Sequence, residues 1–394
     1  MVEYDPYMPE IKRDPLPIYE QMRRERPIYP LERFDAWALT RFEDIWTVCQ
    51  DGEYFSSANG NSDLNLLEGR PSPLQTLASM DGTAQRRLRK ALFPHFGPRA
   101  ARRLEPAMRR WTDECLTRHV DTGRIDAVRD LSQQIAVRVS CAIGGLPVED
   151  ADKLLDLVYR FFTREEGTEG MAEAGREAVV GLWDYLEDAA RQRRASGRSF
   201  GDALDTLTQF RDEEGALLSE ERIARHLLLL VVGATETFPK VFASVLLRLS
   251  EFPDQRRVLC DDPGLIPMAL QEVLRFDTPT QWLGRTVIRE YELRGVRFRV
   301  GQPILMLFPS ANRDEAEFED PNRFDIRRDP KRILTFGHGT HRCLGNHMAA
   351  MEGKVLLEEV LQRFPEYTVL REELVRPETE FVQGYSHFPI AFAT

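Results

Sequence analysis

One cysteine, Cys343, lies among glycines and directly before a predicted helix in the segment 336–345. A cysteine at a helix N-terminus is biased towards the thiolate by the helix dipole and by unpaired N–H groups, and a thiolate can bind a metal ion. The glycines Gly337, Gly339 and Gly345 permit backbone conformations and close approaches that a side chain would block. Such a loop can lie flat beneath a large planar ligand and donate N–H bonds to the sulfur.

The residues alone leave two other interpretations of this segment open. Cys343 could be a small buried side chain in a turn, which is the commonest fate of an intracellular cysteine. It could also bind zinc together with the nearby His338, His341 and His347. Structural zinc sites usually gather their ligands from two separated clusters, and the absence of a second cluster in the sequence disfavours zinc.

A second candidate for chemistry is the acid–alcohol pair Glu236 and Thr237 in the apolar segment 227–239. A helix this rich in leucine and valine is expected to be buried nearly all round. The dipeptide Gly233-Ala234 removes side-chain bulk and Pro239 cannot donate a backbone hydrogen bond, so the helix has a thin, locally opened spot. The pair could relay protons at that spot. Alternatively, the acid forms a buried ion pair and the threonine bonds back to its own helix.

The composition is that of a globular protein, with 42% hydrophobic and 30% charged residues. A net charge of −11 argues against a general nucleic-acid binder. The five cysteines are scattered and suit a reducing compartment better than a disulfide framework. The N-terminus has no signal-peptide pattern, and the longest pure apolar run, 227–232, is too short to span a bilayer. We expect a cytoplasmic protein that does not insert into membranes.

The spacing of apolar residues predicts a mainly helical chain with a smaller β-rich portion. Between about 81 and 273, apolar residues recur at three- and four-residue spacing. The segment 296–300 then alternates strictly between two glycines, and 303–308 follows as an apolar strand. A further helix over about 345–363 precedes a strand-rich tail. Because no repeat or Gly/Ser-rich linker divides the chain, we expect one large α+β domain over 1–394.

The cysteine segment resembles the heme-binding signature of the cytochrome P450 family, F-x-x-G-x-x-x-C-x-G. It fits at Phe336, Gly339, Cys343 and Gly345. The segment 233–237 is similar to the family's central-helix motif, A/G-G-x-E/D-T. The resemblance spans essentially the whole chain and implies the cytochrome P450 fold with heme b (iron protoporphyrin IX) as cofactor.

Two positions of the central-helix segment depart from the family's usual pattern. Phe238 stands where a second threonine is usual, and Ala234 stands where glycine is commoner. Neither departure touches the acid–alcohol pair, although both narrow the space that we expect beside it.

The resemblance assigns roles to individual residues. Cys343 is expected to be the axial iron ligand, and Glu236 and Thr237 are expected to be the catalytic pair that delivers protons to bound O2. The residues expected to contact the heme are Arg89, Gln85, Arg285, His341, Phe336, Gly339, Gly345 and Ala234.

A structural network and a substrate pocket are also expected. Glu272 and Arg275 share a helix face at i, i+3 and can pair; in the family this E-x-x-R pair joins a later arginine, here Arg323. The expected pocket residues are Phe161, Phe162, Val232, Gly233, Trp282, Leu283, Phe381 and Tyr385, together with parts of 57–77. Because aromatic and aliphatic side chains dominate this set, we expect an apolar ligand such as a terpenoid, steroid, fatty acid or polyketide.

The predicted function is therefore that of a heme-thiolate monooxygenase that hydroxylates a hydrophobic small molecule. No flavin or reductase segment is evident, so the expected partners are a ferredoxin and its NAD(P)H-dependent reductase. The arginine-rich stretch 86–103, with Arg342, is a candidate docking face for an acidic ferredoxin, although these arginines could equally bind heme or lie in water.

Two alternatives to this function stay open. A peroxide-driven heme-thiolate peroxygenase would typically lack the acid–alcohol pair, so Glu236 and Thr237 count against it. A non-catalytic heme sensor belongs to another class and would differ in the spectrum of its reduced CO complex.

Overall fold

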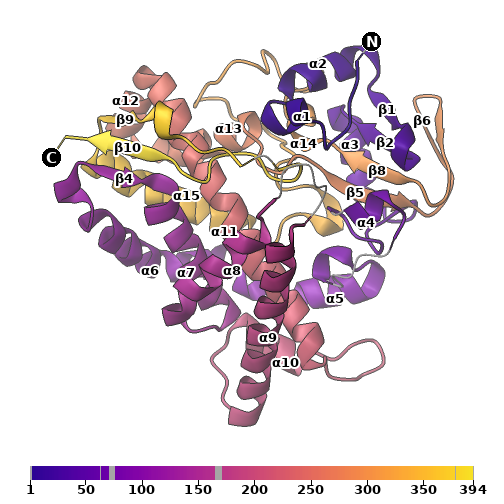
Figure 1. Ribbon diagram of the computed structural model, residues 1–394, viewed down its shortest axis with the longest axis horizontal. Helices are drawn as coiled ribbons and strands as arrows, with labels where there is room; N and C mark the ends of the chain where they lie inside the picture. The colour runs from indigo at the N-terminus through magenta and orange to yellow at the C-terminus, as the bar shows by residue number, and fades with distance from the viewer. Residues whose placement is uncertain (1, 63, 71–75, 165–170, 378, 394) are drawn as a thin grey trace.

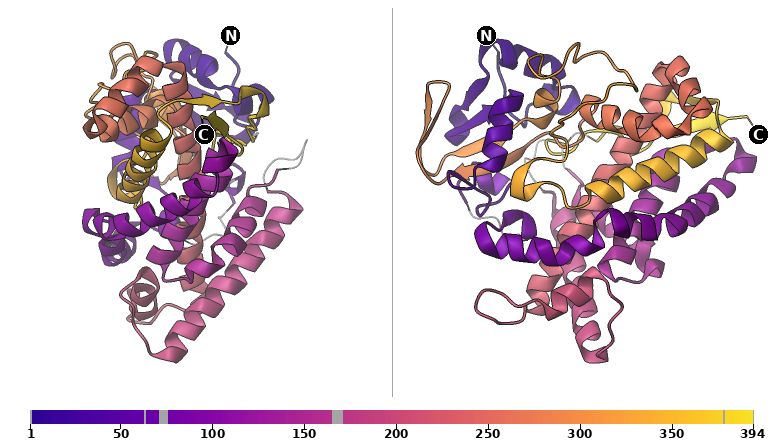
Figure 2. Two further views of the ribbon diagram at one scale, coloured as in Figure 1. Left: turned by 90° about the vertical axis from the view of Figure 1, so that its left-hand side faces the viewer. Right: turned by 180° about the vertical axis from the view of Figure 1, so that it is seen from behind.

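A helical body and a smaller sheet-bearing part lie side by side in the chain (Figures 1 and 2). The computed structural model describes residues 2–62, 64–70, 76–164, 171–377 and 379–393. The predicted mainly helical fold with a smaller β portion is confirmed.

Most of the helices belong to the segments with three- and four-residue apolar spacing. The α-helices of the described residues are α1 (Pro9–Arg13), α2 (Leu16–Glu25), α3 (Phe42–Gln50), α4 (Leu64–Leu67), α5 (Gly82–Leu92), α6 (Pro98–Thr117), α7 (Gln133–Gly144), α8 (Ala151–Phe161), α9 (Glu173–Ser196), α10 (Ala203–Gln209), α11 (Glu220–Glu251), α12 (Pro253–Asp261), α13 (Ile266–Phe276), α14 (Phe308–Ala311) and α15 (Asn346–Arg363).

Within the described residues, the strands form three small sheets. Their bounds are β1 (Ile28–Leu31), β2 (Ala36–Leu39), β3 (Phe55–Ser56), β4 (Arg124–Asp126), β5 (Leu283–Val287), β6 (Tyr291–Leu293), β7 (Val296–Phe298), β8 (Pro303–Met306), β9 (Tyr367–Val369) and β10 (Pro389–Phe392). The largest sheet has the order β1-β2-β8-β5-β3, in which only β2 and β8 run parallel. A second sheet has the order β4-β10-β9, and β6 pairs with β7 as a hairpin.

The hairpin β6-β7 accounts for the alternating segment before Gly301. Its turn places Arg294 at φ 49° and Gly295 at φ 77°, a pair of left-handed residues that matches the twist of a tight hairpin. In β7, Val296 and Phe298 lie on the inner side, whereas Arg297 is exposed. Strand β8 follows and is buried along its whole length, as its uninterrupted apolar sequence predicts.

Helix α11 runs through the middle of the helical body. It begins at the N-cap Ser219, whose side chain accepts a hydrogen bond from the Arg222 N–H, and it continues through Pro239 to Glu251. Its length and composition would suffice to cross a membrane, but 67% of its most apolar window is buried inside the fold, as in a core helix. The neighbouring helices therefore supply the apolar surroundings that its sequence requires.

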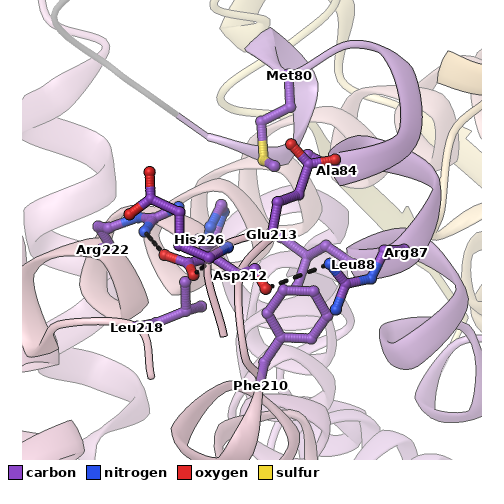
Figure 3. Close-up of a pocket in the computed structure, with 11 residues that line it drawn as sticks. Met80, Ala84, Arg87, Leu88, Phe210, Asp212, Glu213, Leu218, Arg222 and His226 are labelled. Atoms are coloured by element: carbon purple, nitrogen blue, oxygen red, sulfur yellow. Dashed lines mark hydrogen bonds and ion pairs between the residues drawn. The ribbon is translucent and has the colours of Figure 1, made fainter. Parts of the chain in front are cut away.

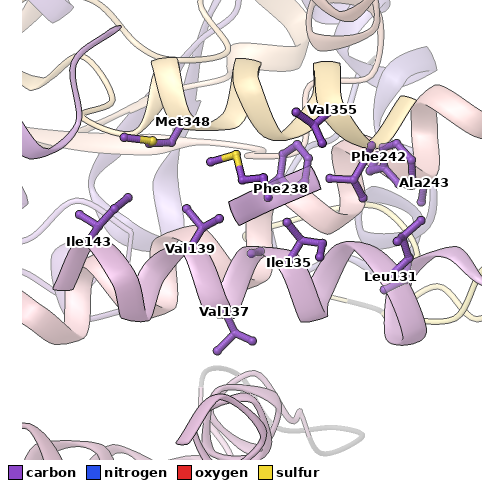
Figure 4. Close-up of a cluster of buried hydrophobic side chains, with 14 of the residues drawn as sticks. Leu131, Ile135, Val137, Val139, Ile143, Phe238, Phe242, Ala243, Met348 and Val355 are labelled. Carbon is purple, nitrogen blue, oxygen red and sulfur yellow. The ribbon is translucent and has the colours of Figure 1, made fainter. Parts of the chain in front are cut away.

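The core on either side of α11 is shown in Figure 4. Ile135 and Val139 of α7 point towards Phe238 and Phe242 of α11, while Val355 of α15 covers the opposite side. All five side chains are at most 5% exposed. Burying aliphatic and aromatic side chains to this extent is worth roughly 1.5–3 kcal/mol for each of them, so this packing holds α11 firmly in place.

The predicted pair of Glu272 and Arg275 forms on α13 with both side chains fully buried. Arg275 Nε donates to Glu272 Oε2 at 2.7 Å, and a second guanidinium nitrogen donates to Oε1 at 2.8 Å. Arg275 also donates to the Asn312 carbonyl at 2.9 Å, and the Asn312 side chain accepts from the Leu334 N–H at 2.8 Å. The network thereby fixes the start of the segment that leads to Cys343.

The expectation that Arg323 completes this network is wrong. Its side chain is 69% exposed and lies 3.6 Å from Asp325. Arg328, five residues later, places its Nε 3.2 Å from Glu272 Oε1, with its side chain 17% exposed. Because the loop turns at Asp320 (φ 45°) and wraps around α13, Arg323 contributes only its main-chain carbonyl, which accepts from Arg275 and Arg328.

Candidate active site

A cavity of about 770 Å³ lies between α11, α15, β5 and the cysteine segment. Its wall is mostly apolar, and its polar groups include Thr237, Arg285 and Cys343. A concave apolar site with a few polar groups is the usual form of a ligand or cofactor pocket. This cavity therefore brings together the two segments that the sequence selected for chemistry, although Thr237 and Cys343 are 106 positions apart in the chain.

Helix α11 contributes one continuous face to the cavity. The residues on this face are Leu229, Leu230, Gly233, Ala234, Thr237, Phe238 and Val241. Their spacing follows the helical repeat of 3.6 residues. Gly233 and Ala234 thus make the helix thin at the point where it borders the cavity, as predicted.

The cysteine segment forms a tight loop before α15. The Cys343 N–H donates to the Phe336 carbonyl at 2.7 Å, which closes the loop. Gly339 has φ +71°, and a Cβ there would lie 2.5 Å from the Cys49 carbonyl oxygen of α3. Only glycine therefore lets this loop approach α3, which explains the glycine at this position of the signature.

The Cys343 side chain faces the cavity, and its exposed surface lies there. Burial is the largest effect and raises the pKa of the free thiol, although the Gly345 and Asn346 N–H groups act to lower it. The guanidinium groups of Arg89 and Arg342 also act to lower this pKa. The sulfur thus has hydrogen-bond donors and positive charge around it, the surroundings that stabilise a thiolate bound to a metal ion.

Four polar side chains expected to bind the cofactor carboxylates lie in the cavity wall: Gln85, Arg89, Arg285 and His341. Gln85 is 1% exposed, and its amide donates to the Thr340 carbonyl at 2.8 Å. Burial lowers the pKa of His341, while Asp81 opposes that shift.

Arg285 provides the test of whether these residues fit an anionic cofactor. Its side chain is 4% exposed, and its one described hydrogen bond goes to the neighbouring Gly284 carbonyl at 2.8 Å. Within the described part of the chain no carboxylate forms an ion pair with it, and burial lowers the pKa of its guanidinium. A buried cation without a counter-ion is costly, so this arginine fits a cavity ligand that carries negative charge, such as a heme propionate.

Sequence reasoning missed the role of Asp81. Its carboxylate accepts from the Ser57 N–H at 3.1 Å and lies 3.3 Å from His341 Nε2. Burial acts to raise the pKa of Asp81, but the hydrogen bonds from His341, Ser56 and Ser57 outweigh it and hold this pKa below its usual value. Asp81 therefore orients His341 at the cavity edge. The signal in the sequence was that Asp81 begins the segment 81–89, which resembles a family segment and also contains Gln85 and Arg89.

The side chains of the acid–alcohol pair, Glu236 and Thr237, point in different directions. Thr237 lines the cavity, whereas the side chain of Glu236 is turned away and 9% exposed. Glu236 Oε1 accepts a hydrogen bond from Lys240 Nζ, one turn further along α11. The buried ion pair that the sequence left open is thus present, and the sequence analysis did not name the lysine.

Several residues expected in the substrate pocket are not part of the described cavity wall: Phe161, Phe162, Val232, Trp282 and Tyr385. Successive strand residues point to opposite faces, so Trp282 packs into a separate apolar cluster while Leu283 faces the cavity. Gly233, Leu283 and Phe381 do line the cavity. From 57–77, Asn61, Ser62 and Leu77 line it, whereas 63 and 71–75 lie outside the described residues.

The aromatic pair at the end of α8 is not part of the described lining of this cavity. The rings of Phe161 and Phe162 meet edge to face with centroids 4.8 Å apart, and Phe162 contacts the main core. Tyr385 likewise packs against Phe388 at 5.3 Å. Phe162 and Tyr385 therefore pack against the main core.

The zinc interpretation finds no support in the geometry. Across the described ranges, no group of three or more His, Cys, Asp or Glu side chains converges in a way that could hold a metal ion. His338 instead stacks on Trp46, with ring centroids 3.5 Å apart and an interplanar angle of 18°. His341 is turned towards Asp81.

A smaller pocket of about 320 Å³ lies on the other face of α5 (Figure 3). Arg222 donates to Asp212 at 3.0 Å, and Arg87 donates to the Asp212 carbonyl at 3.3 Å. Buried His226 lies beside them, and burial lowers its pKa to about 4. Arg222 and Asp212 of this pocket thus form an ion pair, in contrast to Arg285 in the main cavity.

Comparison with known proteins agrees with this geometry. The family model "Cytochrome P450" matches residues 264–384. The putative cytochrome P450 123 of Mycobacterium tuberculosis is 31% identical over 390 residues, which cover 98% of this chain and 96% of that protein. The mycinamicin IV hydroxylase/epoxidase of Micromonospora griseorubida is 35% identical over 358 residues, covering 88% and 85%.

A solved structure gives the same result for the fold. A mutant of P450 EryK in complex with erythromycin B superposes with a TM-score of 0.87 at 29% identity and covers 98% of each chain. This chain therefore belongs to the cytochrome P450 family, and it is a monooxygenase of the bacterial type whose cofactor is heme.

Proposed function

We propose that this chain hydroxylates a hydrophobic small molecule, using O2 and electrons that pass from NAD(P)H through a ferredoxin reductase and a ferredoxin. The observation that carries the proposal is that the Cys343 sulfur and the Thr237 hydroxyl line one apolar cavity. A sulfur ligand and a hydroxyl facing a shared apolar space are the groups that heme-dependent oxygen chemistry needs from the protein.

Cys343 would hold the heme iron, and Arg89, Arg285 and His341 would bind the heme propionates. Gln85 would hold the loop at Thr340 in place, and Phe336, Gly339, Gly345 and Ala234 would shape the space for the ring. When bound, the heme supplies the activation of O2 and the oxidation of the substrate C–H bond. The backbone N–H groups of Gly345 and Asn346 and the nearby guanidinium groups would set how strongly the sulfur donates electrons to the iron.

Thr237 would donate a hydrogen bond from its Oγ into the cavity and hand on a proton there. Glu236 would receive protons from outside the cavity and resupply the threonine. General acid–base groups of this kind typically contribute about 10²–10⁴ in rate. Thr235, two residues earlier, bonds back to the Val231 carbonyl at 2.7 Å and has no such role.

The substrate would occupy the part of the cavity formed by α11, Leu77, Leu283 and Phe381. Relatives named for their action on mycinamicin IV, or solved with erythromycin B, make a macrocyclic polyketide a good first candidate. Steroids, terpenoids and fatty acids are the further classes that an apolar wall favours. A spin-state titration against one member of each class would rank them.

The electron donor would bind beside Cys343, where Arg102 and Arg342 are exposed and reach the cavity. Arg87, which the sequence placed in the same basic stretch, is instead bound to the carbonyls of the loop between α10 and α11. An acidic ferredoxin fits such a cationic surface. We also propose that 1–394 is a single domain and that the enzyme works in the cytoplasm.

The test compares Thr237→Ala with Thr235→Ala in the enzyme reconstituted with ferredoxin, its reductase and NAD(P)H. Thr237→Ala should release most reducing equivalents as peroxide, with product falling about tenfold or more, because the cavity loses its proton donor. Thr235→Ala should behave as the wild type. Fully coupled turnover of Thr237→Ala would rule out the proton-relay role.

The same preparation separates the two alternatives. A peroxygenase would turn over with peroxide alone at a rate that ferredoxin and NAD(P)H do not increase. A heme sensor would bind heme and give no product with any electron donor.

A further inference from the structure

Lys240 is a buried charge that the proposed function does not use. Its side chain is 2% exposed, and its Nζ donates both to Glu236 Oε1 and, at 3.4 Å, to the Glu236 carbonyl. Buried lysines are rare because removing an ammonium group from water is costly. This lysine is therefore present for a reason other than ordinary packing.

The pair does not join separate parts of the fold. Both residues belong to α11, at i and i+4, so their contact bridges only one turn of one helix. A buried ion pair is often no more stabilising than an apolar pair of similar volume, and α11 is already fixed by its apolar faces. The stability of the fold therefore does not explain why a charged pair lies at this position.

The lysine stem is held from behind by the C-terminal loop. Gly384 lies so close that a Cβ there would be 2.5 Å from Lys240 Cβ and 2.9 Å from Cγ. Phe381 of the same loop lines the cavity. The absence of a side chain at Gly384 therefore makes room for Lys240.

The position of the pair relates it to the reaction. Glu236 directly precedes Thr237, whose side chain lines the cavity. A buried carboxyl group without a partner takes up a proton and becomes neutral. Lys240 supplies Glu236 with a partner of opposite charge, because its Nζ donates a hydrogen bond to Glu236 Oε1.

We propose that Lys240 is a positioning residue for oxygen activation: it keeps Glu236 ionised and held along α11, so that the acid can accept the proton that Thr237 needs. The inference rests on the proposed function, because it gives Lys240 its role through Glu236 and Thr237. In the relay, Glu236 gains one proton from water and passes one on to Thr237, so the pair returns to its starting charge.

The first measurement needs no turnover. Isotope-edited infrared spectra of the resting heme protein, with Glu236→Gln as the reference that assigns the signal, report whether Glu236 is ionised. Wild type and Lys240→Arg should show a carboxylate, and Lys240→Met should show a protonated carboxyl group. A carboxylate in Lys240→Met would overturn the proposal.

The second measurement is the share of electrons that reaches product. Lys240→Met should lose about tenfold in coupling, within the range that an acid–base group supplies, while Lys240→Arg restores most of it. The double variant Glu236→Gln/Lys240→Met removes both charges and should couple as well as Glu236→Gln alone. If Lys240→Met does not fold, the double variant still tests the proposal, because it leaves no buried carboxyl group without a partner. A double variant clearly worse than Glu236→Gln alone would show that Lys240 acts independently of Glu236 and would overturn the proposal.

Gly384→Ala perturbs the lysine without changing any charge. It should displace the lysine stem and shift Glu236 towards the protonated form; an unchanged carboxylate signal would contradict the role given to this contact. A wild-type protein without the thiolate spectrum of its reduced CO complex would instead refute the proposed function itself, so the two failures are distinguishable.

Discussion

At the scale of single residues, the site is organised around charges that lack partners until the cofactor binds. Arg285 is the clearest example, because it is 4% exposed and no described carboxylate pairs with it. Glu236 is the opposite case, since Lys240 neutralises it within the same helix. The unpaired charge of Arg285 thus lies in the cavity wall, whereas the paired charge of Glu236 is turned away from the cavity.

Arg285→Met should have opposite effects on the apoprotein and the heme protein. Without heme, the variant should be more stable than the wild type, because a buried unpaired charge has been removed. With heme, it should hold the cofactor about tenfold to a hundredfold less tightly, since a hydrogen bond to a charged group contributes roughly 1.5–3 kcal/mol. Thermal unfolding of the apoprotein and the rate of heme transfer to apomyoglobin measure the two effects. An apoprotein destabilised by the change would contradict the assignment.

At the scale of elements, the loop after α14 supplies a buried arginine to α13. Arg328 and Arg323 lie on the same loop, but only Arg328 reaches Glu272. The two arginines are therefore a matched pair for testing the network.

Arg328→Met should destabilise the protein by about 3 kcal/mol, because removing one partner leaves Glu272 with less compensation for its buried charge. Arg323→Met should change stability by less than about 0.5 kcal/mol, as is usual for an exposed side chain. Chemical denaturation of both variants gives the comparison. Equal losses of stability in Arg328→Met and Arg323→Met would contradict the position of the loop that brings Arg328, and not Arg323, to Glu272.

Because His226, near the start of α11, is buried, we expect the stability of the protein to depend on pH. Burial lowers its pKa to about 4, so the folded protein holds it neutral where the unfolded chain, with an ordinary pKa of about 6.5, takes up a proton. The unfolded state therefore binds more protons, and stability is lost as pH falls from about 6.5 towards 4. Between pH 7.5 and 5 the loss amounts to about 2 kcal/mol.

His226→Gln should remove this part of the acid destabilisation. The measurement is the free energy of unfolding of wild type and variant at several pH values, with the difference between them isolating the histidine. A difference that stays constant across the acid range would show that His226 titrates normally in the folded protein.

The elements were largely predictable, because periodicity and glycine positions carry their signal. Helix α15 and strand β8 begin within one residue of their predicted starts. Side-chain direction was less predictable. The sequence predicts both Val232 and Gly233 in the pocket wall, but a helix presents only one face to a cavity, and Val232 lies outside that face. Arg323 and Arg328 could not be distinguished because the path of an irregular loop is set by tertiary contacts. The pairing of Glu236 with Lys240 was not predictable either, because it requires the helix to continue through Pro239.

At the scale of the whole molecule, the helical body and the sheet-bearing part meet at the cavity. Helices α11 and α15 form two of its sides, and β5 contributes Arg285 and Leu283. Arg102 and Arg342 are exposed and line the same cavity as Cys343, and this is where we propose that the electron donor binds. The smaller pocket at His226 lies on the other face of α5 (Figure 3).

Charge reversal at Arg102 should slow reduction by an acidic ferredoxin several-fold at low salt, and the effect should shrink near 0.1 M salt, where the Debye length is about 10 Å. Arg87→Glu is the matched control, because Arg87 faces the loop between α10 and α11. Stopped-flow reduction at several salt concentrations provides the rates. If both reversals slow reduction equally, net charge and not a docking surface controls the rate.

The central claim is that the Cys343 sulfur binds the heme iron. The absorption spectrum of the reduced CO complex tests it most directly, in wild type and in Cys343→Ser. Wild type should show the red-shifted Soret band of thiolate ligation, and Cys343→Ser should lose it. A wild-type spectrum typical of nitrogen ligation, or an unchanged band in Cys343→Ser, would contradict the account.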